Sequence, residues 1–363
     1  MIVRDQPSIF KVLFSWRGTI LPKVLPPLGV VMLVSAIIGI LSYVGYFHFP
    51  ELPLVGFTLI GVVLSIFLGF KNSACYDRWW EARKLWGILI ANSRHFDRDC
   101  RILTQGRRER VIQHVIVFAN VLRDRLRHQT ANPTELVQTS GLSQNALTQL
   151  YQQANAPQYT LSLIQWELMQ ALKEGEISDI VYAQLNQHVA DLSVVQTGCD
   201  RIATTPLPFA YSVLLNRTVY FFCLILPFSL GSTLGIFTPL LVGVLAYTFL
   251  GLDALSSEIE EPFGTQSNDL PLDSMVRTIE IELLGTLGKP TPPPFKHKTI
   301  TYSNRAHAYL LLGYIAHGEG GNDLYSLDKT FPNPHLPVFD SGNIAQLNPR
   351  HIVTMKVTTD RYF

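Results

Sequence analysis

The sequence predicts an all-α membrane protein with four transmembrane helices in two hairpins and a large helical cytoplasmic region. Three observations lead to this fold class. Charged side chains are absent from residues 24–47, 52–70 and 218–252, although 16% of the chain is charged. Apolar positions between these runs recur at helical spacing. Alternating patterns of the kind that predict strands are almost absent from the same stretch.

The first two runs predict a helical hairpin. About 20 helical residues cross the hydrocarbon of a bilayer, so we expect spans at about 24–47 and 52–74. Only a short connection, "HFPEL", separates the runs; it contains Pro50 and is followed by Pro53. Proline and a short polar connection favour a tight turn.

The third uncharged run is too long for one ordinary span. Proline and glycine in "PFSLGSTLG", from Pro227 to Gly235, favour a turn there. We therefore expect two further spans, at about 208–228 and 236–255, which form a second hairpin. A single tilted helix is the alternative.

Basic residues indicate the direction of the spans. Lysine and arginine are frequent in residues 71–110 and in the N-terminal flank, and both hairpin turns lack them. The excess of lysine and arginine in cytoplasmic loops places both termini in the cytoplasm, and the protein in the inner (plasma) membrane.

The cytoplasmic part is expected to be helical over 75–205 and 256–287, and to complete one domain over residues 1–287. The proline-rich stretch "GKPTPPPFKHK" starts a tail, 288–363, to which the sequence assigns no role. Within that tail, 351–359 is a possible short strand.

Several functional classes find no support in the sequence. A net charge of +1 gives no reason to expect a nucleic-acid partner. The four cysteines have no metal-ligand spacing, and the common catalytic and phosphate-binding motifs are missing. We therefore expect no enzyme and no cofactor. A secondary transporter stays open as an alternative, although the uncharged runs contain no charge to serve as a coupling site.

The stretch "VVLSIFLGFKNSACYDRWWEARKLWG", Val62 to Gly87, carries the functional hypothesis. It changes from apolar to charged without proline or a turn signal, so one helix should leave the bilayer unbroken. Val62, Ile66 and Phe70 recur every four residues on this helix. Beside them lies a row of small residues that can pack on a neighbouring helix: Gly61, Ser65, Gly69 and Ser73. A helix of this kind can line a wet interior, which several copies of the chain would have to build.

Three segments resemble the bestrophin family of ion channels, and more closely its bacterial branch. They are "FLGFKNSACYDRWWEARKLWG", "TTPLPFAYSVLLNRTVYFFCLILPF" (204–228) and "EIEEPFGTQSNDLPLD" (258–273). The resemblance covers about residues 1–287 in order and spacing, and the tail has no counterpart in it.

This resemblance implies a homopentamer in the lipid bilayer with one central pore for small monovalent ions. It implies a pore neck at Val62, Ile66 and Phe70, and a second constriction at Ile180, with Leu207 as the alternative. Glu176 and Asp179 can form an acidic cytoplasmic mouth, which favours cations (Na⁺ or K⁺) over chloride. An anion-selective channel is the alternative.

Calcium is a further point of comparison with the family. Animal members bind calcium through an acidic run directly after the "PFG" motif. Here that stretch offers only Asp269 and Asp273, whereas calcium takes six to eight oxygen ligands. The sequence therefore argues against calcium activation, with these two carboxylates as weak candidates for a metal site.

Overall fold

The computed structural model describes residues 16, 18–44, 54–129, 136–137 and 140–295, with the side chains of residues 232 and 233 left out. These residues belong to one compact unit, Met1–Lys298. Every secondary-structure element that the described residues form is a helix, which confirms the predicted all-α class. The tail beyond residue 295, with the possible strand at 351–359, lies outside the described residues.

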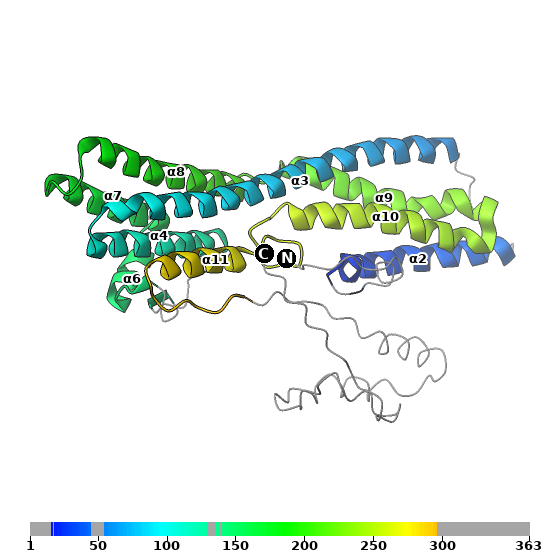
Figure 1. The fold of residues 1–363 in the computed structure, drawn as a ribbon. Coiled ribbons are helices and arrows are strands. Elements are labelled where there is room, and N and C mark those ends of the chain that lie inside the picture. Colours follow the sequence, from blue (N-terminus) through cyan, green and yellow to red (C-terminus); the bar gives the residue numbers. More distant parts are fainter. Residues whose placement is uncertain (1–15, 17, 45–53, 130–135, 138–139, 296–363) are drawn as a thin grey trace, which may run out of the picture. The chain divides into compact units, whose positions relative to one another are not determined.

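Four helices form an apolar bundle: α2 (Leu21–Val44), the first half of α3 (Leu54–Asp99), α9 (Phe209–Leu234) and α10 (Thr238–Ile259) (Figure 1). Their shared core includes Val31, Leu64, Val219 and Val242, all nearly inaccessible to solvent. The described residues contain four helices that are long and apolar enough to cross a membrane, and they are these four.

A second, charged bundle contains the rest of α3, together with η1 (Cys100–Ile102), α4 (Gln105–Leu126), α6 (Gln144–Tyr151), α7 (Ala156–Lys173), α8 (Asp179–Thr204) and α11 (Leu272–Thr286). Trp86, Phe96 and Phe118 are fully buried in its core. Its helices carry apolar stripes at the expected spacing, and ion pairs join many of their polar faces.

Helix α3 belongs to both bundles. It runs for 46 residues without interruption, which corresponds to about 69 Å at 1.5 Å per residue. The predicted unbroken exit from the apolar run is confirmed, and the predicted span boundary at residue 74 falls inside this helix (Figure 1).

The turn of the second hairpin is shorter than predicted. Helix α9 continues through Pro227 as far as Leu234, and the break comes at Gly235, which has a φ of 51°. The predicted end of the third span at residue 228 was too early, because a proline inside a packed apolar helix is tolerated when neighbouring groups satisfy the freed backbone. The single tilted helix is also excluded, since η2 (Gly235–Phe237) separates α9 from α10.

The segment after α10 also differs from its prediction. Instead of one helical stretch over 256–287, α10 ends at Ile259 and α11 begins at Leu272. The residues between them form turns, in which the Leu270 amide donates to the Pro262 carbonyl at 2.9 Å. The indole of Trp79 donates to the Asn268 carbonyl at 3.0 Å, which attaches this segment to α3.

The row of small residues on α3 does not pack against another described helix along its length. Gly61 lies near Phe222, but Ser65, Gly69 and Ser73 are exposed. Larger residues form the buried row of this helix instead: Leu64, Leu68, Lys71 and Cys75. Within the described chain no helix covers the small row, and its packing on a neighbouring helix stays a prediction.

Candidate ion path

The three residues predicted to form the neck lie on an uncovered side of α3. Val62 is 52% exposed, Ile66 50% and Phe70 62%. Successive members are four residues apart, so each turns by about 40° around the helix axis relative to the one before. The described part of the chain thus leaves an apolar strip of this helix open.

This strip continues along α3 into the charged bundle. Five further residues lie within about 40° of Ile66 around the helix axis, and all are exposed: Ser73, Asp77, Trp80, Lys84 and Ile88. We call these eight residues, from Val62 to Ile88, the exposed face of α3. It is apolar at its start and carries both signs of charge farther on.

The side of α3 away from the exposed face is anchored by a buried ion pair. Lys71 is 2% exposed, and its Nζ lies 2.8 Å from Asp253 Oδ1 on α10. Asn216 Nδ2 on α9 donates to the other carboxylate oxygen at 3.1 Å. One carboxylate therefore joins three helices at the end of the apolar strip nearest the charged bundle.

Sequence reasoning did not find this anchor. Lys71 directly follows one uncharged run and Asp253 directly follows another. The sequence offered one signal for this pair: a basic residue and an acidic residue stand at the corresponding ends of two predicted spans.

Further polar contacts hold α3 at this level. The phenol of Tyr211 donates to the Phe67 carbonyl at 3.0 Å. Farther along, the Arg78 guanidinium donates to the carbonyls of Ile202 at 2.7 Å and Glu260 at 3.3 Å. These contacts connect α3 to the ends of α8, α9 and α10, so the exposed face is carried by a firmly positioned helix.

An apolar groove of about 400 Å³ runs beside the exposed face, between α3 and α9. Its lining includes Val63 and Phe67 from α3 and Leu214 from α9. Ser65 and Gly69 are exposed on the opposite flank of the exposed face. The two flanks of α3 therefore differ, since one is a groove lined by large side chains and the other is a smooth row of small ones.

The predicted second constriction has one well-exposed candidate. Ile180, at the second position of α8, is 77% exposed. Its alternative, Leu207, is half-buried, and its amide donates to Glu260 Oε1 at 3.0 Å. Ile180 is thus the side chain with more freedom to reach another copy of the chain.

The two acids of the predicted mouth lie in different environments. Glu176 is mostly buried and its Oε2 lies 2.8 Å from Arg107 Nε. Asp179 is exposed and makes no ion pair with any described residue. Within one chain, Glu176 shares the Arg107 guanidinium with Glu174, which lies 2.6 Å from Nη2, and Asp179 is the open acid.

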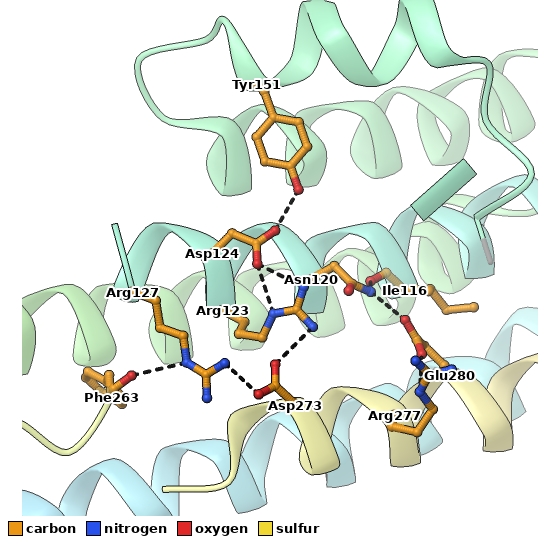
Figure 2. A network of polar contacts seen from close by, with 10 residues as sticks. All are labelled: Ile116, Asn120, Arg123, Asp124, Arg127, Tyr151, Phe263, Asp273, Arg277 and Glu280. Carbon is orange, nitrogen blue, oxygen red and sulfur yellow. Dashed lines mark hydrogen bonds and ion pairs between the residues drawn. The ribbon is translucent and has the colours of Figure 1, made fainter. Parts of the chain in front are cut away.

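The two weak candidates for a metal site are separately engaged. Asp273 Oδ2 accepts from Arg127 Nη1 at 2.7 Å, within the polar network of Figure 2. Asp269 is buried, burial raises the pKa of its carboxyl, and its Oδ2 accepts from the Gln266 amide at 2.6 Å. No cluster of three metal-ligating side chains occurs among the described residues.

The network in Figure 2 joins α4 to α6, to α11 and to the segment that precedes α11. Asp124 on α4 accepts from the Tyr151 phenol at 2.7 Å and pairs with Arg123 at 2.8 Å. Arg127, one turn farther, binds Asp273 of α11 and the carbonyl of Phe263. These bonds fix the segment between α10 and α11 on α4, which indicates a structural role for Asp273.

Comparison with known proteins gives consistent results. A family model described as "Bacterial/Fungal Bestrophin protein" matches residues 1–285. The protein YneE of Salmonella typhi, named a voltage-dependent anion channel-forming protein, is 41% identical over 287 residues, which are 78% of this chain and 93% of YneE. The protein mll4386 of Mesorhizobium japonicum has the same descriptive name and is 38% identical over 304 residues, 80% of this chain and 94% of mll4386.

A solved structure matches as well. The crystal structure of a bacterial Bestrophin homolog from Klebsiella pneumoniae superposes with a TM-score of 0.68 at 37% identity. The match covers 74% of this chain and 99% of that one.

Proposed function

The chain belongs to the bestrophin family of ion channels, and on this premise we propose that several copies of it surround one ion path lined by the exposed face of α3. One observation carries the proposal. The apolar residues Val62, Ile66 and Phe70 are left open on a helix whose other side is buried and anchored. The same face becomes polar where α3 leaves the apolar bundle, as the wall of a water-filled path would.

The two unlike flanks of α3 support a ring of copies. The groove at Val63 and Phe67 on one side and the small residues Ser65 and Gly69 on the other can meet head to tail. Head-to-tail interfaces close into rings when the rotation allows it. We take five copies from the family resemblance, and the placement of basic residues puts the charged bundle and both termini in the cytoplasm.

The neck would control the flow of ions through its wetting. Rings of Val62, Ile66 and Phe70 side chains can exclude water from a narrow path and open it when they separate. Ile180 would form a second apolar ring at the cytoplasmic mouth.

We propose that the permeant ion is an anion. The relatives YneE and mll4386 are both named anion channel-forming proteins. The expected preference for cations depended on Glu176 and Asp179, and the first of these is mostly buried in an ion pair with Arg107. The predicted preference for cations is therefore not supported, and the anion-selective channel is the better hypothesis.

The test of the function is a current measurement. The purified full-length chain, eluting as an oligomer, is fused into planar bilayers under a tenfold NaCl gradient. We expect an ohmic current that reverses towards the chloride equilibrium potential. Reversal towards the sodium potential would overturn the anion assignment, and saturable coupled flux without ohmic current would indicate a transporter.

The neck has its own test in the same bilayers. Ile66→Ala and Phe70→Ala should raise the single-channel conductance or the open probability, because each widens an apolar ring. Ile37→Ala is the matched control, since this isoleucine is as exposed as Ile66 but lies on α2, away from the exposed face and the groove. Unaltered currents in both neck variants would place these side chains against lipid or a neighbouring helix.

A further inference from the structure

Lys84 has an unusual position on α3. Eighteen residues separate it from Ile66, which is about five full helical turns, so both side chains leave the helix in the same direction. The axial distance between them is about 27 Å at 1.5 Å per residue. Lys84 therefore lies on the line of the neck residues, well inside the charged bundle.

The ammonium of Lys84 is also uncompensated. Its side chain is exposed and makes no ion pair with any residue that the structure describes. Two other basic residues of α3 are paired, Lys71 with Asp253 and Arg94 with Glu282 at 2.6 Å. A lysine that neither pairs nor packs is free to act on ions that pass it.

We propose that Lys84 is a specificity-determining residue that attracts anions into the path, an inference that rests on the proposed function. In a ring of copies, each chain contributes one such ammonium at the same level. A confined path between walls of low dielectric constant focuses such a charge and raises the local concentration of the opposite ion.

Asp77 is the opposing charge on the exposed face. It is exposed, has no ion pair among the described residues and lies seven positions nearer the neck, which is about 10 Å along the axis. The Debye length at physiological ionic strength is about 8 Å, so each charge acts mainly on its own section of the path. Removal of the Lys84 charge should therefore increase the relative permeability of cations, whereas removal of the Asp77 charge should increase that of anions.

The experiment uses the full-length chain in planar bilayers under a NaCl gradient. Lys84→Glu should lower the chloride-to-sodium permeability ratio by about tenfold, the lower end of the range by which a focused charge alters local ion concentration. Lys84→Gln should fall between this variant and the unaltered chain, and Asp77→Asn should shift the ratio in the opposite direction.

Arg83→Gln provides the matched control. It removes one positive charge at the same level of the same helix, but Arg83 points about 100° away from the exposed face. Its reversal potential should stay that of the unaltered chain. An equal shift in Arg83→Gln and Lys84→Gln would show that total charge matters and that the position of Lys84 does not.

A chemical variant separates this inference from the proposed function. All four native cysteines are buried, so Lys84→Cys introduces the accessible thiol. A cationic methanethiosulfonate should restore the selectivity of the unaltered chain, and an anionic one should shift it further towards cations. If the unaltered chain conducts and Ile66→Ala raises its conductance, but no Lys84 variant moves the reversal potential, the role of Lys84 is refuted and the channel stands. Absence of current from the intact oligomer would refute both.

Discussion

Lys71 illustrates how a single residue positions the exposed face. A buried ammonium is costly unless a counter-charge and hydrogen bonds replace its water. Here the Asp253 carboxylate supplies the charge at 2.8 Å, and Asn216 binds the second carboxylate oxygen. Because Lys71 follows Phe70 directly, this pair holds α3 at the end of the neck.

Removing one partner of this pair should destabilise the protein. Lys71→Met leaves the Asp253 carboxylate buried without its cation, and the loss of a partner in a buried pair costs about 3–5 kcal/mol. We expect a clearly lower midpoint of thermal unfolding for the purified variant. The double variant Lys71→Met/Asp253→Leu should recover most of the loss, and a double variant no more stable than the single one would contradict the pairing.

His114 gives the stability of the charged bundle a dependence on pH. Burial is the main cause that lowers the pKa of this imidazole in the folded chain, so the unfolded chain binds its proton at higher pH. Above the unfolded pKa of about 6.5 the ring is neutral in both states, and the folded chain keeps its full stability. As the pH falls below about 6.5, the unfolded chain binds a proton that the folded chain does not, so the free energy of unfolding decreases.

The variant His114→Gln should show this contribution. We expect the thermal midpoint of the unaltered chain to fall more steeply below pH 6.5 than that of the variant, because the amide does not titrate. The measurement is thermal unfolding at a series of pH values. Parallel curves for the two proteins would exclude His114 as the source.

Residue identities in the candidate path could be predicted only where the signal is local. Periodicity shows that Val62, Ile66 and Phe70 share one side of one helix, and their assignment to a neck is a prediction from the family resemblance. The partners Lys71 and Asp253 are 182 residues apart, and no pattern along the chain pairs them. The same applies to Glu176 and Arg107, so the acidic mouth could not be evaluated before the fold was known.

At the scale of elements, α3 is one helix that belongs to both the apolar bundle and the charged bundle. Its periodicity does not change at Phe70, although its composition does, and no helix-breaking residue intervenes. For this reason the sequence predicts its continuity well. The second hairpin is harder, because proline is a strong break signal in water but a weak one inside an apolar bundle.

Gly235 is the element-scale position where backbone conformation matters. Its φ of 51° and ψ of −121° belong to a region that residues with a side chain rarely adopt. Gly235→Ala should therefore cost about 1–3 kcal/mol and lower the thermal midpoint. Gly29→Ala is the control, since this helical glycine has no other atom near the added methyl group. An equal effect in both variants would contradict a special role for the turn.

At the scale of the whole molecule, one chain supplies only part of the ion path that we propose. It presents the exposed face of α3, the groove at Val63 on one flank and Ser65 on the other. The sequence predicted the family through its motifs, which the comparisons confirm. It could not predict the sign of the permeant ion from a count of acids, because ion pairs within the chain remove some of them from the path.

The most direct test of the central claim is a cysteine scan of α3 with charged thiol reagents during current recording. All four native cysteines are buried, so each introduced thiol reports its own position. We predict that modification alters the current at Ile66→Cys, Ser73→Cys and Asp77→Cys, and leaves it unchanged at the flanking variants Ser65→Cys and Phe67→Cys. Modification that acts on the flanks and spares the exposed face would place that face against lipid or protein and contradict the account.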